Sequence, residues 1–502
     1  MEEQTTNELV ENSTAKKTDD EPPRKTNKLK NWLDNYFKVT KSGSTFRIEI
    51  IAGLTTFMTM VYALLVVPGM YNSSVSFNAV YIATALGAIT GTMLMAFMAK
   101  MPLAQASGLG ATAYVSGTLL GAGTGLTYAN AMVFVLVDGL LFIFITATGL
   151  RKKILHGIPS EVKVAISVGI GLFIAFIGMN SSGLVQIRGG SIGFASFNIL
   201  SEDLEYLAVI GTALTLVGVI VIGILSAKNV KGSMLFGMLA VTALYYIFAG
   251  LGCAFDNQVC LDTFKNVSLD NPFKAFKDWG KESVGQVFLN GFNFSNYLSI
   301  ENNNAGTLIL LIITSALSLC MIDMFDTIGT LYGACSKGNL LDEQGNPLRM
   351  NQCMLSDAIA TTVGSVCGAT TVTTYVEASA GVAAGGKTGF TALITGLCFT
   401  AALFLSPIAK IIPSCATSAA LIWVGALMMS AVKDIDWQNP VTALPAFLTI
   451  AVMAFGYSIS YGIGIGIISC VIIKLCTKKI KEISIVTWVI ALLFILTFLL
   501  TN

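Results

Sequence analysis

Two short segments decide the fold: PLAQASGLGATAYVSGTLL at residues 102–120 and ATTVTTYVEASAGVAAGGK at residues 369–387. Both are rich in Gly, Ala, Ser and Thr, and each follows a pair of long apolar segments. We predict that each begins as a β stretch, Leu103 to Ala106 and Thr370 to Thr374, and continues as a half-helix. Because irregular backbone in a membrane is tolerated only around a protein-lined cavity, this pattern indicates an inverted repeat with a binding site between the halves. The alternative is a pair of Gly-rich packing helices.

The composition places the surrounding chain in a membrane. Of 502 residues, 54% are hydrophobic and 12% are charged, about half the charged share of an ordinary soluble domain. The 30 Lys and Arg residues nearly balance the 29 Asp and Glu residues, so no basic excess is available to bind nucleic acid. We therefore predict an all-α polytopic membrane protein that sits in a lipid bilayer.

Apolar stretches of about 20 residues, the length that spans a bilayer, recur along the chain. Together with the two short segments they predict 14 transmembrane segments ending at Lys474. A further apolar helix at 484–500 either crosses the membrane or lies at its surface. The long predicted stretches are 48–70, 76–99, 129–150, 160–180, 205–227, 232–252, 306–333, 352–368, 388–411, 415–432, 442–458 and 459–474.

Positive charges predict the orientation of this array. If the N-terminus is cytoplasmic, the basic residues between segments also fall on the cytoplasmic side. These are Lys100, Arg151 to Lys153, Lys228, Lys231, Lys337, Arg349, Lys387, Lys433, Lys478, Lys479 and Lys481. The polar residues 1–28 are predicted to be a disordered cytoplasmic tail, and His156 lies in a predicted cytoplasmic loop. In the predicted extracytoplasmic loop, Cys253 and Cys260 either form a disulfide or remain thiols.

Few ionisable side chains lie within the apolar segments, and these are the candidate functional residues. Glu377, in the second short segment, could accept hydrogen bonds from a ligand or take up a proton. Asp323 and Asp326 are three residues apart, so on a helix they share a face, and two such close carboxylates resist ionising together. We expect all three to be involved in proton coupling, with Asp326 nearer a ligand and Asp323 the more structural.

Three single charges in apolar segments, Asp138, Lys163 and Asp357, are expected to belong to buried networks before any proton path. The sequence contains no paired CxxC spacing for a metal and no GxxxxGK[ST] loop for ATP. The placement of its one histidine rules out a Ser/His/Asp set at a site within the membrane. We therefore expect no enzymatic activity, no cofactor and no bound metal, and a gradient-driven carrier is the simplest function.

Six motifs resemble the azaguanine-like branch of the nucleobase–cation symporters, which are permeases for adenine, guanine and hypoxanthine. The last three of these motifs are specific in combination. The motifs are AGLTTFMTMVYALLVVP (52–68), ALGAITGTMLMAFMAKMPLAQASGLGATA (85–113), ISVGIGLFIAFIGM (166–179), DMFDTIGTLYG (323–333), YVEASAGVAAGGKTGFTA (375–392) and VKDIDW (432–437).

The resemblance implies 14 helices arranged as 7+7 inverted repeats, with short β stretches interrupting segments 3 and 10. A core domain would comprise residues 48–150 and 306–411, and a gate domain residues 151–252 and 412–474. The remaining parts would be a tail and lead-in (1–47), an extracytoplasmic loop (253–305) and a C-terminal apolar helix (475–502). By resemblance alone, we also expect a homodimer formed through the gate domain.

The resemblance also implies a purine site between segments 3 and 10, where Glu377 and Asp326 would bind the base and couple its movement to protons. Backbone N–H groups from Gly108 to Ala113, including those of Gly110 and Ala111, and others near Tyr375 and Val376 would complete the site. Phe57 and Phe325 are candidates for stacking on the base, although core packing is the more common role for such residues.

The sequence departs from the family pattern at the first of these segments. Thr112 stands where the family usually has a functional asparagine, and Ser107 where it has a proline. The expected substrate is therefore one purine, a modified purine or another small heterocycle. Two other functions stay open. One is an anion carrier or channel of the same architecture, although carboxylates at both Asp326 and Glu377 disfavour a site for anions. The other is a non-transporting sensor that binds a nucleobase.

Overall fold

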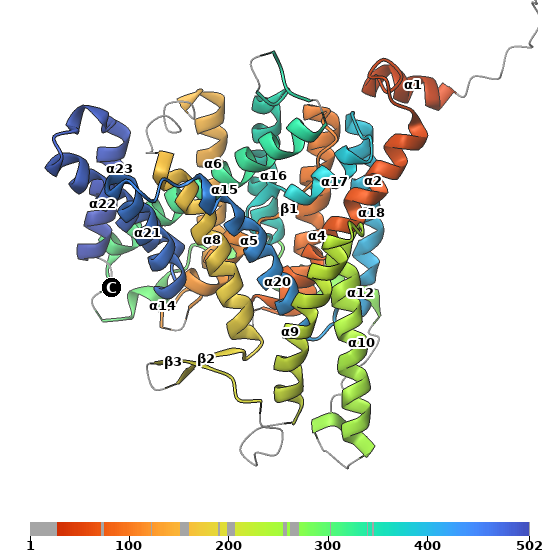
Figure 1. Ribbon diagram of the computed structural model, residues 1–502, viewed down its shortest axis with the longest axis horizontal. Helices are drawn as coiled ribbons and strands as arrows, with labels where there is room; N and C mark the ends of the chain where they lie inside the picture. Colours follow the sequence, from red (N-terminus) through yellow and green to blue (C-terminus); the bar gives the residue numbers. More distant parts are fainter. Residues whose placement is uncertain are drawn as a thin grey trace, which may run out of the picture.

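The structure is a computed structural model, and the part of the chain that it describes is almost entirely helical (Figure 1). The predicted tail, the basic run from Arg151 to Lys153, and His156 lie outside the described residues. The described residues are 28–71, 75–121, 123–150, 160–188, 191–197, 206–254, 259–261, 271–301, 303–338, 340–343 and 346–500.

Each long apolar stretch in the sequence forms one helix or two or three consecutive helical elements. In the described residues, ten helical runs are long and apolar enough to cross a membrane, and two shorter apolar helices accompany them. The chain is thus a multi-pass membrane protein. The long elements are α2 (Phe46–Met60), α3 (Ala63–Gly69), α4 (Phe77–Leu94), η1 (Met95–Ala99), α6 (Tyr128–Ala147), α8 (Ser160–Ser181), α9 (Tyr206–Ala227), α10 (Ser233–Ala254), α15 (Ala305–Lys337), α16 (Met350–Cys367), α18 (Gly389–Ala402), α20 (Ser414–Met428), α21 (Pro440–Phe455), α22 (Ile459–Cys476) and α23 (Ile485–Leu500).

Polar residues next to the apolar runs fix where several helices begin. The Thr45 and Ser76 side chains accept hydrogen bonds from the backbone N–H groups of the first turns of α2 and α4. Thr127 and Asn130 form a reciprocal capping box at the start of α6. Each cap satisfies N–H groups that the helix itself leaves unpaired. At the other end of α16, Gly368 has a φ of 90°, a left-handed conformation that glycine adopts without a Cβ clash.

Two short strands lie between the helices, one in each of the two Gly/Thr-rich segments (Figure 1). β1 (Gln105–Ser107) pairs antiparallel with β4 (Val372–Thr374). β1 leads into α5 (Leu109–Ala113), and β4 leads into η3 (Val376–Ala378) and α17 (Ser379–Ala383). The pairing satisfies backbone groups that a membrane interior would otherwise leave unbonded.

Glycines on one face of α4 let the strand pair lie directly against that helix. A Cβ added at Gly91 would lie 2.8 Å from Cγ1 of Val372, and one at Gly87 would lie 3.2 Å from Cγ2 of the same residue. Gly87 and Gly91 are four residues apart and therefore share a face. A larger residue at either position would push β4 away from α4.

The helices pack in two groups. α8, α9, α10, α20, α21 and α22 contact one another, and α2, α4, α6, α15, α16 and α18 form a second set of contacts. The groups meet at several places: α15 contacts α8 and α22, α2 contacts α10, α3 contacts α20, and α5 contacts α8. At this contact a Cβ on Gly110 would lie only 2.8 Å from Cγ2 of Ile170, so α5 and α8 approach each other closely.

Two features of the connecting segments were not settled by the sequence. β2 (Val185–Arg188) and β3 (Ser191–Phe194) form an antiparallel hairpin that extends away from the helices (Figure 1). The hairpin lies between the predicted apolar stretches 160–180 and 205–227. Cys253 and Cys260 form no disulfide. Cys260 is instead buried against Leu207 and Ala249.

Candidate functional site

Glu377 lies in η3, immediately after the strand pair, and is partly exposed. The hydroxyl of buried Tyr62 donates a 2.7 Å hydrogen bond to its Oε1 atom. The Thr59 hydroxyl donates to the backbone carbonyl of Glu377 at 3.2 Å. Because a carboxylate can accept about four hydrogen bonds, Glu377 is held in place while keeping capacity for a ligand.

Asp326 approaches from α15 and is also partly exposed. Its Oδ2 atom lies 3.5 Å from the Thr373 hydroxyl of β4, and it is within electrostatic range of Glu377. The neighbouring Phe325 is half-buried and packs against the apolar core. The structure therefore brings together two carboxylates that are separated by 51 positions in the sequence (377 − 326).

The half-helix α5 follows β1 and contacts α15, the helix that carries Asp326. Among the described residues, no acceptor pairs with the N–H groups of its first three residues, Leu109, Gly110 and Ala111. Gly108 differs from the sequence expectation, because its N–H donates to the carbonyl of Thr371 at 2.8 Å. Its backbone group joins the two short segments and does not face a ligand.

Tyr375 also joins the two segments. Its N–H donates to the carbonyl of Ala104 at 3.2 Å, and its hydroxyl donates to the carbonyl of Ser107 at 2.6 Å. The N–H group of Tyr375 itself is therefore used between the two segments, and the expected donors near Tyr375 and Val376 stay a prediction. The Tyr375 ring remains near the site, with its centroid 6.5 Å from that of Tyr62. The next residue, Val376, is exposed.

A buried hydrogen-bond network supports the strand pair from behind. Asp357 of α16 accepts hydrogen bonds from the Gln105 side-chain amide and from the hydroxyls of Thr327 and Thr374. These donors come from β1, α15 and β4. A single carboxylate thus links four elements, and its removal would leave several buried donors without an acceptor.

A second pair of carboxylates lies deeper in the protein. Asp138 of α6 and Asp323 of α15 are both fully buried and within electrostatic range of each other. Within the described residues, neither oxygen of Asp138 has a hydrogen-bond partner, and neither does Oδ1 of Asp323. The other oxygen of Asp323 lies 3.4 Å from the Thr361 hydroxyl. Lys163 is half-buried near the start of α8.

Two other predicted site residues are held by neighbouring groups. Thr112 is fully buried, donates to the carbonyl of Gly108 at 2.8 Å and lies 2.8 Å from the hydroxyl oxygen of Thr370. Phe57 packs edge-on against Phe399 of α18, with ring centroids 5.4 Å apart. The structure therefore places Phe57 in the packing between α2 and α18.

Tyr62, Thr59 and Gln105 are not among the site residues predicted from the sequence. Gln105 carries the one amide side chain in the first short segment, which is a usable signal. Tyr62 and Thr59 lie in an apolar helical stretch, where hydroxyl groups commonly serve packing. Only their contacts with Glu377 distinguish them.

A multi-pass helical bundle with partly exposed carboxylates beside a central strand pair has the features of a membrane permease. Residues 47–465 match the Permease family, that of the xanthine and uracil permeases, and the chain belongs to this family. Within it, the chain belongs to the branch of adenine, guanine and hypoxanthine permeases. The protein is accordingly a transporter and not an enzyme.

Relatives of known name match along nearly their whole length. The chain is 37% identical over 463 residues to the guanine/hypoxanthine permease PbuO of Bacillus subtilis (strain 168), covering 91% of this chain and 98% of that one. It is 32% identical over 465 residues to the adenine permease AdeP of Escherichia coli (strain K12), covering 92% and 95%.

A solved structure resembles this fold. The transmembrane domain of a cyanobacterium bicarbonate transporter, BicA, matches with a TM-score of 0.55 and 15% sequence identity, covering 82% of this chain and 96% of that one. At this identity the likeness concerns the fold alone.

Proposed function

We propose that this permease takes up a purine nucleobase across the cell membrane together with protons. The observation that carries the proposal is the position of Glu377, fixed by Tyr62, close to Asp326. The helix of Asp326 also contacts α5, whose first N–H groups have no acceptor among the described residues. The guanine/hypoxanthine and adenine permeases among the relatives support a purine as the substrate.

The chemistry of the site suits the edge of a purine. A purine presents N–H groups, which a carboxylate can accept, and ring nitrogens or a carbonyl oxygen, which backbone N–H groups can donate to. Glu377 would bind the donors of the base, and the N–H groups of Gly110 and Ala111 would bind its acceptors. Thr112 follows these N–H groups in α5 and takes the place of the family asparagine. Its size and polarity would therefore influence which purine the site prefers.

The movement would carry one helix group past the other. We assign residues 48–150 and 306–411 to a core domain and residues 151–252 and 412–474 to a gate domain. The chain would cross the membrane 14 times as two inverted repeats of seven segments, with its N-terminus in the cytoplasm. The separate packing of the two helix groups supports this division. The glycine at position 110 would let α5 slide past Ile170 of α8 during an elevator-like step.

Buried carboxyl groups would carry the protons. An unpaired charge in a buried site is destabilised by several kcal/mol, which favours proton uptake at Asp323 and Asp138, where oxygen atoms have no partner among the described residues. Asp326 would connect this pair to the substrate, because it lies on the same helix as Asp323 and within electrostatic range of Glu377.

The test is uptake of labelled adenine, guanine, hypoxanthine, xanthine and uracil in cells that lack their own permeases, with and without a protonophore. We expect uptake of at least one purine, and its loss when protonophore is added. Glu377→Gln and Asp326→Asn should each abolish uptake while the protein remains in the membrane. Asp436→Asn, which changes an exposed carboxylate outside the site, is the matched control and should transport normally.

Each part of the proposal can fail separately. Normal uptake by both site variants would overturn the site assignment. Uptake that persists with protonophore would overturn proton coupling. Purine binding to the purified protein without uptake in cells would instead indicate a sensor.

A further inference from the structure

A basic pocket lies at one end of the protein, away from the carboxylates. Its volume is about 350 Å³, within the range of small-molecule sites. Its lining includes four cationic side chains and no acidic one. The cations are Lys38, Lys100, Arg349 and Lys387, all but Lys38 among the residues predicted to be cytoplasmic by the charge pattern.

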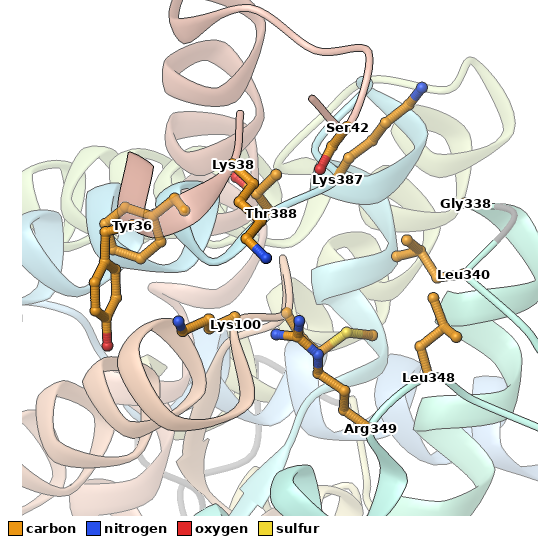
Figure 2. Close-up of a pocket in the computed structure, with 12 residues that line it drawn as sticks. Tyr36, Lys38, Ser42, Lys100, Gly338, Leu340, Leu348, Arg349, Lys387 and Thr388 are labelled. Carbon is orange, nitrogen blue, oxygen red and sulfur yellow. The ribbon is translucent and has the colours of Figure 1, made fainter. Parts of the chain in front are cut away.

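The four cations come from four separate segments of the chain. Lys38 follows α1 (Lys28–Phe37), Lys100 follows η1, Arg349 precedes α16, and Lys387 precedes α18. Figure 2 shows Lys38 and Arg349 directed toward a common space, Lys100 extending toward Tyr36, and Lys387 at the rim and pointing outward. Such convergence depends on the fold, because these residues are far apart in the sequence.

None of the described residues that line the pocket is acidic, but the buried Glu49 carboxylate lies next to it and accepts hydrogen bonds from the backbone N–H of Lys387 and the hydroxyl of Thr388. Within the described part of the chain, none of the four forms an ion pair. Lys100 lies 4.0 Å from the centroid of the Tyr36 ring, and Arg349 donates one hydrogen bond to the carbonyl of Ala99 at 3.0 Å. Both contacts fix the direction of the side chain and leave other N–H donors available.

The backbone at these positions is unusual. Lys38, Lys100 and Arg349 have φ values of 56°, 53° and 53°, in the left-handed region where a side chain is unfavourable and glycine is preferred. They make up half of the six non-glycine residues with positive φ in the described chain. Lys478, which lies outside the pocket, shares this conformation with a φ of 60°, so the left-handed backbone does not by itself indicate a ligand.

We propose that this pocket binds a phosphate group, supplied either by the headgroup of an anionic phospholipid or by a soluble phosphate. Arginine and lysine donors arranged around one space match the oxygens of a phosphate, with arginine able to bind two of them at once. The site is separate from the purine site and does not depend on its assignment. A bound phosphate would tie together the segments before α2, after η1 and before α16.

The test uses the purified full-length protein and two probes. The first is inorganic phosphate added to protein in detergent. The second is a comparison of nanodiscs made of phosphatidylcholine alone with nanodiscs that also contain phosphatidylglycerol. Because a ligand that binds the native state raises its stability, we expect the midpoint of thermal unfolding to rise with one probe. A rise with phosphate identifies a soluble ligand, and a rise only with phosphatidylglycerol identifies a lipid.

Glycine variants separate ligand binding from other roles of these charges. Lys100→Gly and Arg349→Gly relieve the left-handed backbone, so they should fold, but they should weaken binding of the active probe about tenfold or more. Lys478→Gly is the matched control, because Lys478 also has a left-handed φ of 60°, is exposed and lies outside the pocket. Lys100→Arg, which keeps the charge, should retain the response.

Two results would overturn the proposal. One is a wild-type protein whose unfolding midpoint responds to neither probe. The other is an equal response in Lys100→Gly, Arg349→Gly and Lys478→Gly, which would mean that these cations serve membrane orientation or helix ends only.

Discussion

The hydrogen bond from Tyr62 to Glu377 gives the sharpest test of the site. We expect Tyr62→Phe to remove this single bond and to leave the ring packing intact, because only the hydroxyl is lost. The bond is 2.7 Å long and its acceptor is a carboxylate. Hydrogen bonds to charged groups contribute about 1.5–3 kcal/mol, which corresponds to a change of about ten- to 150-fold in affinity.

The assay is the concentration dependence of purine uptake. If Tyr62 holds Glu377 in the orientation that binds the base, Tyr62→Phe should raise KM by about ten- to 150-fold. Because Glu377→Gln is expected to abolish uptake, the double variant is compared with it by purine binding to the purified protein, where it should bind little worse than Glu377→Gln alone. Such non-additivity would show that the two side chains act as one unit.

Tyr81→Phe is the matched control. Tyr81 is fully buried, and its hydroxyl also donates a 2.7 Å hydrogen bond, but to the carbonyl of Ala402 outside the site. This variant should lose some stability and transport with an ordinary KM. If Tyr62→Phe and Tyr81→Phe have the same KM, the proposed role of Tyr62 is refuted.

Three further predictions follow from the packing and the buried network. Gly110→Val should abolish uptake and lower the free energy of unfolding by about 1–3 kcal/mol, because the new side chain clashes with Ile170. Adding Ile170→Ala should restore part of the uptake and part of the stability. Normal uptake by Gly110→Val would argue against sliding of α5 past α8. Asp357→Leu should destabilise the protein by about 1–3 kcal/mol for each donor left unpaired. The measurement is the midpoint of thermal unfolding in detergent. A midpoint equal to that of the wild-type protein would show that the Asp357 network contributes nothing to stability. Thr112→Asn, at a fully buried position bonded to Thr370, should shift the order of preference among labelled purines, and an unchanged order would mean that this position does not set selectivity.

The membrane-spanning helices could be predicted from the sequence because their signal is local. A run of about 20 apolar residues needs to span the bilayer as a helix, whichever other segments surround it. Each long apolar stretch forms helix in the structure, and η1, for example, ends beside Lys100, where the charge pattern places a loop. The β stretches were also predictable from their composition, although β1 begins at Gln105, two residues after the predicted Leu103.

The candidate site was predictable only in part. Charge in an apolar stretch is rare enough to single out Glu377 and Asp326. The free N–H groups were harder to assign, because hydrogen bonds across the strand pair decide which of them are used. Gly108 and Tyr375 each donate to the opposite segment, whereas Gly110 does not, and nothing in the local sequence separates these cases.

By itself, the sequence determined the class of protein, the positions of its helices and the small set of buried charges on which the proposed function depends. These properties follow from composition and from periodicity over neighbouring residues. Only the tertiary structure decided the partners. Tyr62 meets Glu377 from 315 positions away, Gln105 meets Asp357 from 252 positions away, and three left-handed cations line one pocket. Such contacts depend on how distant segments pack against one another. The sequence next to a hydroxyl, an amide or a lysine does not predict which group that side chain will contact.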